Sequence, residues 1–205
     1  MKNINQKEKL LAKNLPPQKA EEFILTRGYA RHFLGDLFDV PPMEVPLRAL
    51  PGSPPLIAKE WGNISFSHCE DAILIGWCKE KIGVDIERSD RNFKAEKIIS
   101  RFYNDQEKLD LKKLSPHLKG SQALKLWVLK ESAIKLKNGN LAIDLSKWII
   151  KNSLTNAYHE KLKIEIDTRF FKYKSWFIGI ALSEISFLEE EIEIYEIFTA
   201  HPKRK

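Results

Sequence analysis

Alternating apolar and polar positions predict three short strands in the first half of the chain. These runs are NISFSHC (63–69), DAILIGWC (71–78) and KIGVDIE (81–87), separated by polar turns. Upstream, apolar side chains recur at helical spacing across residues 16–38, after two prolines at the entrance, and predict a helix. Residues 40–62 are rich in proline, which favours an ordered loop or a short strand. The first half is therefore expected to be one helix followed by a small sheet.

The second half repeats this order of helix and then sheet. Residues 93–114 and 122–139 have helical periodicity, and the second segment stops at Asn138 and Gly139, a pair that favours a helix C-cap. Four strand-like runs follow, at 141–150, 161–171, 175–184 and 191–198. Because the order occurs twice, the pattern indicates an α+β fold of two similar halves rather than alternating βαβ units.

The boundary between the halves is expected just after Glu87. This gives an N-terminal half of residues 1–87 and a C-terminal half of residues 88–205. Ligand sites lie preferentially in clefts between domains, so the join is where we expect the active site.

Composition describes a soluble globular protein, with 205 residues, 43% hydrophobic and 30% charged. The N-terminal segment has no apolar core of a signal peptide, and no apolar run approaches the roughly 20 residues of a membrane helix. Two cysteines without close spacing, Cys69 and Cys78, argue against a disulfide framework or structural zinc. A reducing cytoplasm is the expected location.

Two carboxylates stand at alternate positions of the run IGVDIE. Residues two apart on a strand share a face and lie about 6.6 Å apart along it, so Asp85 and Glu87 can lean toward one cation. Such a pair could supply two carboxylate ligands of a magnesium site. It is also a common feature of an edge strand with one solvated face, so the pattern taken alone is weak evidence for a metal site.

A second candidate lies in the segment LKLWVLKESAIK. Trp127, Glu131 and Lys135 are spaced i, i+4, i+8 and so form one ridge on the predicted helix. An ordinary exposed Glu–Lys pair beside a core tryptophan has the same spacing. A third metal ligand next to a phosphate-binding cation is the functional alternative.

The net charge of +6 and the pI of about 9.1 invite an anionic partner. Residues 108–137 hold eight lysines against two acids, Asp110 and Glu131. A nucleic-acid-binding module would have such a charge, but carboxylates on a groove-lining strand would repel a phosphate backbone. A solvated helical face and a docking surface for an acidic protein would also have this charge pattern.

The motifs together resemble those of the 4′-phosphopantetheinyl transferases. Gly83-Val84-Asp85-Ile86-Glu87 resembles the family's G-[VI]-D-x-E strand, and residues 127–135 (WVLKESAIK) resemble its W-x-x-K-E-[SA]-x-x-K helix. Four further stretches resemble family motifs in the expected order: EEFILTRGYAR (21–31), PGSPPL (51–56), SFSHC (65–69) and RFYNDQE (101–107). The length and the doubled helix-then-sheet order resemble the larger, Sfp-type subfamily, whose two halves are related by pseudo-twofold symmetry.

The resemblance implies an enzyme with holo-acyl-carrier-protein synthase activity. It would transfer 4′-phosphopantetheine from coenzyme A to a serine of an acyl or peptidyl carrier protein, releasing 3′,5′-ADP. Mg²⁺ is the implied cofactor, with Mn²⁺ as the alternative. The implied partner is an acidic helical bundle that docks on the lysine-rich span, and neither nucleic acid nor membrane is an expected partner. We expect a monomer. A catalytically silent relative that binds CoA or a carrier protein as a scaffold is the remaining alternative.

The resemblance also implies roles for the individual residues that match the family's motifs. The resemblance implies a metal ion held by Asp85, Glu87 and Glu131, with Lys135 on an α-phosphate oxygen or protonating the leaving group. Glu131 is also a candidate base for the serine proton, and Glu107 is a second candidate acid.

A further set of residues is implied to bind CoA through its phosphates or adenine: Arg27, Arg31, Gly52, Ser53, Ser67 and His68. Ser53 departs from the pattern, since many relatives have Lys or Arg after the loop glycine.

Overall fold

The computed structural model describes residues 3–151, 154–183 and 192–196. The described helices are α1 (Gln6–Lys13), α2 (Pro17–Phe38), α3 (Ala95–Phe102), α4 (Asp105–Lys112), α5 (Pro116–Leu136) and α6 (Leu141–Asp144), with 3-10 turns η1 (Pro42–Glu44) and η2 (Lys59–Trp61). The described strands are β1 (Asn63–His68), β2 (Ile73–Cys78), β3 (Ile82–Arg88), β4 (Trp148–Ile150), β5 (Asn156–His159), β6 (Ile164–Tyr173) and β7 (Trp176–Leu182).

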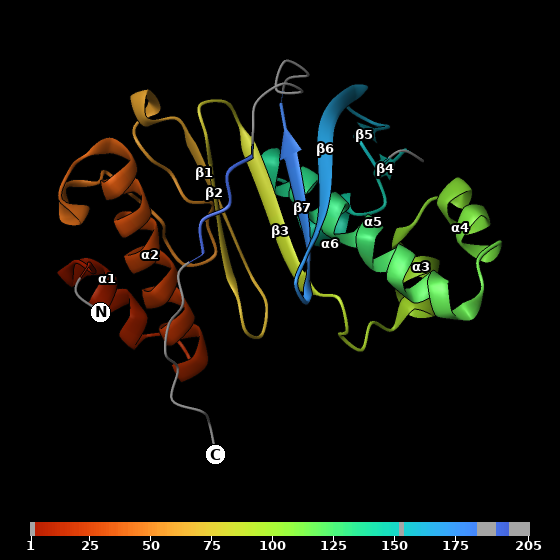
Figure 1. Cartoon of the computed structure of the whole chain (residues 1–205), viewed down its shortest axis with the longest axis horizontal. Helices are drawn as coiled ribbons and strands as arrows, with labels where there is room; N and C mark the ends of the chain where they lie inside the picture. The colour runs from red at the N-terminus through yellow and green to blue at the C-terminus, as the bar shows by residue number, and fades with distance from the viewer. Residues whose placement is uncertain (1–2, 152–153, 184–191, 197–205) are drawn as a thin grey trace.

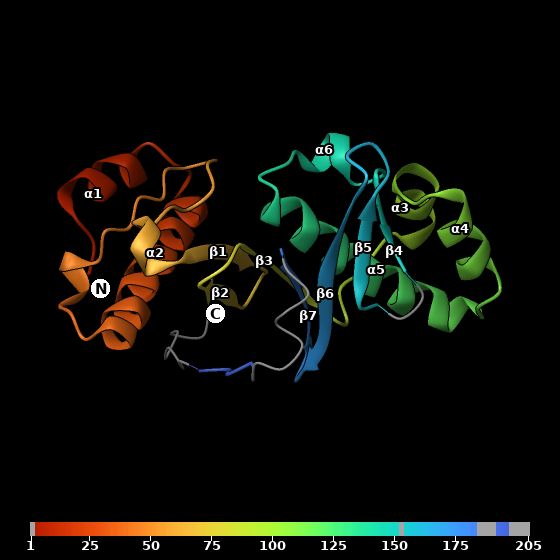
Figure 2. The same cartoon turned by 90° about the horizontal axis from the view of Figure 1, so that it is seen from above.

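Two antiparallel sheets form the centre of the molecule (Figure 1). β1 and β2 make a hairpin, and five strands pair in the order β3-β7-β6-β5-β4. Helices α1 and α2 lie on the hairpin side, while α5 crosses the five-stranded sheet and runs toward α3 and α4 (Figure 2). The α+β class is thereby confirmed. The pseudo-twofold relation and the division after Glu87 stay predictions; β3 itself pairs with β7 and also packs against β1.

The strongly periodic segments formed the expected elements, and the differences have local causes. The predicted helix at 93–114 is two helices, because Tyr103 is extended and Asn104 caps α4 with its side chain on the Glu107 N–H. The run 141–150 forms a strand only at β4, after the short helix α6. β5 and α1 were not foreseen.

At the C-terminal end, residues 192–196 form no strand. The remainder of the strand predicted at 191–198 lies outside the described residues.

Two hydrophobic clusters stabilise the two sides of the molecule. The smaller joins α2, the loop after it and β1, through residues including Leu34, Leu47 and Ile64. The larger surrounds α5 and includes Leu129, Trp148 and Ile166. Among the described residues, no helix combines the length and the apolar character that crossing a membrane requires.

Two glycines let α5 lie unusually close to its sheet. A Cβ on Gly83 of β3 would stand 2.0 Å from the Ser132 carbonyl oxygen, and one on Gly179 of β7 would stand 2.6 Å from the Val128 carbonyl oxygen. Both positions therefore require the absence of a side chain. The glycine of the GVDIE motif thus serves helix–sheet contact, and this contact brings α5 next to the carboxylates of β3.

Serine hydroxyls connect β1 to β3. The backbone N–H of Val84 donates to Ser65 Oγ at 3.1 Å, and that of Ile86 donates to Ser67 Oγ at 3.3 Å. The edge of β3 that does not face β7 thereby has partners for its buried N–H groups. This contact fixes the end of β1 beside Asp85.

Candidate active site

Three carboxylates from two elements meet between β3 and α5. Asp85, Glu87 and Glu131 each offer an oxygen, and these oxygens all lie within 4.8 Å of one another. The two strand residues share a face, as their i, i+2 spacing requires, and the ridge of α5 adds the third. The structure thus brings together the three residues that the sequence assigned to metal binding.

Asp85 is the buried member of this cluster, 2% exposed. Its Oδ1 accepts from Ser67 Oγ and from Lys135 Nζ, each at 2.7 Å, and Lys135 Nζ also lies 2.8 Å from Ser67 Oγ. Its Oδ2 is buried and has no hydrogen-bond partner among the described residues. A buried carboxylate oxygen without a partner is costly. A hard cation that prefers oxygen ligands would satisfy it, so the three residues fit Mg²⁺ or Mn²⁺.

Glu131 holds its proton strongly in this arrangement. Burial raises the pKa of Glu131 to about 8, and the nearby negative charge of Asp85 contributes to that rise. Burial also raises the pKa of Glu87, while Arg91, which is bound to one of its oxygens, opposes that rise. Raised carboxyl pKa values in a cluster are typical of functional sites, since a structural pair would normally lower them.

The end of β1 lies between the polar ends of two long helices. Ser67 contacts Lys135 of α5, whereas the next residue, His68, contacts α2. His68 Nε2 is 2.8 Å from Glu22 Oε1 and 3.3 Å from Lys19 Nζ, and Lys19 Nζ is 3.0 Å from Glu22 Oε2. Burial lowers the pKa of His68.

Lys19 is a residue that the sequence reasoning missed. It stands three positions before Glu22 on α2, outside the stretch 21–31 that resembles the family motif, and only the fold brings it to His68.

The two arginines of α2 are committed elsewhere. Arg27 donates through Nε to the Ala49 carbonyl at 2.9 Å and lies over the Phe23 ring, and burial lowers its pKa to about 10. Arg31 is 2% exposed and pairs with Glu8 at 2.8 Å. Their role in binding CoA stays a prediction that these contacts do not support.

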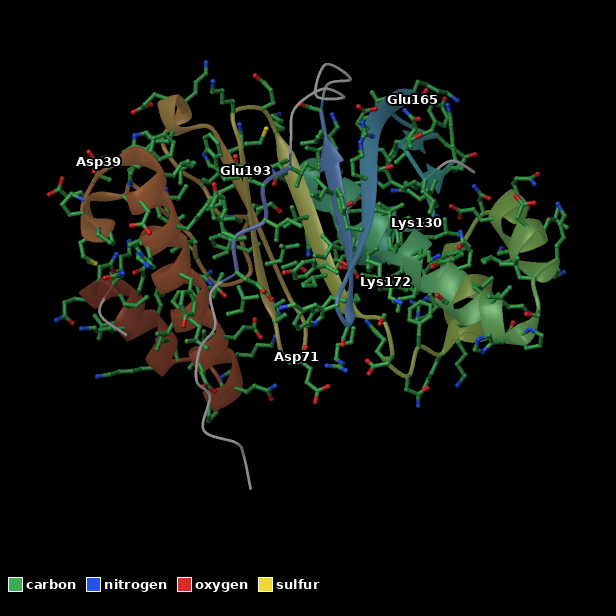
Figure 3. The ribbon with its side chains drawn as sticks, in the orientation of Figure 1. Asp39, Asp71, Lys130, Glu165, Lys172 and Glu193 are labelled. Atoms are coloured by element: carbon green, nitrogen blue, oxygen red, sulfur yellow. The ribbon has the colours of Figure 1, made fainter. Side chains whose placement is uncertain are left out.

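Glu107 is likewise held in the core. Its Oε2 is 2.7 Å from Lys130 Nζ, and its Oε1 accepts from the Ile150 N–H at 3.1 Å. Lys130 is fully buried and also donates to the carbonyls of Leu145 and Trp148; Figure 3 shows it on α5. The pair lies outside the three-carboxylate cluster, so a catalytic role for Glu107 stays a prediction that these contacts do not support.

The glycine–proline loop is exposed. Gly52 and Ser53 lie in a turn whose flanking residues, Arg48 and Leu56, pair through their backbones. Within the described part of the chain, neither residue belongs to the cluster of carboxylates. Their part in binding CoA stays a prediction.

The carboxylates of β3 and α5 fall inside a segment that matches a family model. The model describes the 4′-phosphopantetheinyl transferase superfamily, and it matches residues 81–181, which contain all three. The matched segment, residues 81–181, belongs to this superfamily.

A curated relative agrees with this membership. The 4′-phosphopantetheinyl transferase gsp of Aneurinibacillus migulanus is 27% identical over 105 residues, which are 50% of this chain and 43% of that protein. The match therefore spans less than half the length of the relative. Membership supports phosphopantetheine transfer in general, and the details of the reaction are proposals.

Proposed function

We propose that this phosphopantetheinyl transferase moves the 4′-phosphopantetheine group of coenzyme A to a serine of an acyl or peptidyl carrier protein, giving the holo carrier protein and 3′,5′-ADP. The observation that carries the proposal is the meeting of Asp85, Glu87 and Glu131 beside Lys135, within the segment that matches the superfamily. The reaction breaks the pyrophosphate of CoA, so negative charge develops on phosphate oxygens and must be stabilised.

The three carboxylates would hold Mg²⁺, or Mn²⁺ in its place. When bound, such an ion stabilises developing charge on phosphate oxygens. The orphan oxygen of Asp85 and the all-oxygen donor set support this assignment.

Lys135 would contact an α-phosphate oxygen and supply a proton to the leaving group. Its ammonium group lies 2.7 Å from Asp85 Oδ1 and is 27% exposed, so it can reach a ligand without leaving the cluster. Glu131 is the candidate base for the serine proton. Burial raises its pKa to about 8 in the metal-free site, and a bound cation would lower that pKa, so that the carboxylate could accept a proton near neutral pH. Metal ligand and base remain two roles for the same carboxylate.

His68 and Ser67 would contact the phosphates of CoA, with Lys19 as an additional cation. This assignment rests on the end of β1, which presents the two residues toward α2 and α5. We further propose a monomer of the larger Sfp-type subfamily acting in the cytoplasm, with the lysines of 108–137 that remain at the surface docking an acidic carrier protein.

The decisive experiment is intact-mass analysis of an apo acyl carrier protein incubated with the protein, CoA and Mg²⁺. We expect a gain of about 340 Da, the phosphopantetheinyl group, which EDTA and Glu131→Ala abolish. Glu165→Ala is the matched control, because that carboxylate pairs with Lys151 at the surface (Figure 3) and should leave the reaction intact.

A carrier protein that gains no mass although CoA binds would indicate the silent scaffold. No mass gain and no CoA binding would reject the proposal, and salt-dependent retention of RNA or DNA would then favour the nucleic-acid alternative.

A further inference from the structure

Each carboxylate of β3 already has an internal counter-ion. Arg91 binds Glu87, and Lys135 binds Asp85 at 2.7 Å. Arg91 belongs to the turn that follows β3, in which its N–H donates to the Arg88 carbonyl, and its guanidinium also lies 5.4 Å from the Phe93 ring centre. The backbone turn therefore directs this arginine back over the last acidic residue of the strand.

These two cations oppose a metal ion that enters alone. A divalent ion in the cluster would lie within a few Å of a guanidinium and an ammonium group, and like charges at such distances repel. The ion would also share the Glu87 carboxylate with Arg91, which binds one of its two oxygens. Arg91 and Lys135 neutralise the carboxylates when no metal is bound, and they therefore weaken the binding of a metal ion that enters without a second ligand.

The same two cations favour an anion. The pyrophosphate of CoA carries about two negative charges, one for each phosphate group, and an arginine fork matches phosphate geometry well. Arg91 and Lys135 can also contact phosphate oxygens, which would neutralise the two cations and weaken their repulsion of a metal on the carboxylates. Arg91 is 35% exposed and Lys135 27%, so both can turn toward a ligand.

We propose that Arg91 couples the two ligands of this site, so that a divalent cation and the pyrophosphate of CoA bind with positive cooperativity. The inference rests on the proposed function, because it takes CoA as the anionic ligand. Arg91 is a phosphate-contacting residue in the loaded site and the counter-ion of Glu87 in the empty one. By linkage, the factor by which CoA tightens metal binding equals the factor by which the metal tightens CoA binding.

Direct binding tests this without any turnover. Free Mn²⁺ is measured by electron paramagnetic resonance during titration of the protein, with and without saturating CoA, and CoA binding is measured by calorimetry with and without Mn²⁺. We expect CoA to lower the Kd of Mn²⁺ by about 5- to 150-fold, the usual range of such coupling. The reciprocal titration should give the same factor.

The Arg91→Ala variant distinguishes a specific role of this residue from the general effect of removing one positive charge. The variant should bind Mn²⁺ more tightly than the wild type in the absence of CoA, bind CoA more weakly, and show a coupling factor smaller by roughly threefold or more. Arg91→Lys keeps a cation and should be intermediate. Arg101→Ala is the matched control: it removes the same charge from a residue of α3 whose guanidinium lies over the Phe102 ring rather than on Glu87.

Two results overturn the inference. One is a Kd of Mn²⁺ that CoA leaves unchanged in the wild type. The other is an Arg91→Ala variant whose metal affinity and coupling factor equal those of Arg101→Ala. If the carrier protein still gains phosphopantetheine, only this inference fails; if CoA does not bind at all, the proposed function fails with it.

Discussion

The two long helices, α2 and α5, both contain a buried ion pair, but they differ in the charged residues beside it. Each pairs a buried cation with a glutamate of a short helix: Arg31 of α2 pairs with Glu8, and Lys130 of α5 pairs with Glu107. Both glutamates are also the N3 members of capping boxes, so each closes the first turn of a short helix while it neutralises a buried cation.

The helices differ in what stands beside the buried pair. On α5 the residue after Lys130 is Glu131, which joins the carboxylates of β3. On α2 the neighbouring arginine, Arg27, is also turned inward, and the helix offers Lys19 and Glu22 to His68. Close contact with a sheet through Gly83 explains the difference, because α5 lies directly on the strand that carries acids. A charged motif therefore acquires a function only through the element against which it packs.

The largest expected loss of stability is at a buried ion pair, and its size should differ between the pair of α5 and the pair of α2. Lys130→Met leaves Glu107 buried without its cation and should lower the free energy of unfolding by about 3–5 kcal/mol. Arg31→Met should cost about 1–3 kcal/mol, because α1 buries only Glu8 and Ala12 and can separate to hydrate the glutamate. Urea unfolding of both variants measures the contrast. Equal losses would show that α1 is anchored as firmly as α4.

A smaller effect is expected in the pH dependence of stability, through the carboxyl group of Glu131. Its pKa is raised from 4.5 to about 8, so between these values the folded, metal-free protein binds a proton that the unfolded chain has released. Its stability should therefore fall as the pH rises from about 5 to 8. A tenfold difference in proton affinity between the folded and unfolded states corresponds to about 1.4 kcal/mol, and the interaction with Asp85 spreads the change over the cluster.

Glu131→Gln, which resembles the protonated form, should remove most of this slope. Urea unfolding in EDTA at about pH 5.5, 7 and 8.5, on either side of the raised pKa, measures it. Glu165→Gln is the control at a surface carboxylate. Identical slopes in wild type and Glu131→Gln would contradict the raised pKa.

The smallest effect is expected at a surface pair on α4. Lys113 and Asp110 lie 2.7 Å apart, but the lysine is 71% exposed. Lys113→Met should change the unfolding free energy by no more than about 1 kcal/mol, since water solvates both partners well. A thermal unfolding scan beside Lys130→Met shows the contrast between a buried and an exposed lysine of the same span. A large loss would mean that α4 depends on this pair.

Much of the fold could be predicted, because the spacing of apolar residues within each helix or strand is a local property of the sequence. β1, β2, β3, α2 and α5 follow from runs of apolar residues at strand or helix spacing. The failures lie where spacing alone is ambiguous. The break at Tyr103 depends on a cap at Asn104, and the run at 141–150 contains apolar residues that suit either element.

The candidate site likewise has some features that local spacing predicts and others that it does not. The i, i+2 spacing of Asp85 and Glu87 and the ridge of Glu131 and Lys135 are local, and the structure assembles all four. The sequence could not show that Lys130 faces the core while Glu131, its neighbour, faces the cluster. It also gave no sign that Arg27 and Arg31 have internal partners, or that Lys19 and Arg91 reach the site.

By itself the sequence determined which side chains share a face of a strand or helix, because backbone geometry repeats about every two or 3.6 residues. Only the tertiary structure decided which of those faces meet. The close approach of α5 to β3 that Gly83 permits and the serine hydrogen bonds between β1 and β3 join segments far apart in the chain, and no local period encodes them. Contacts of that kind made a cluster of Asp85, Glu87 and Glu131 from two separate motifs.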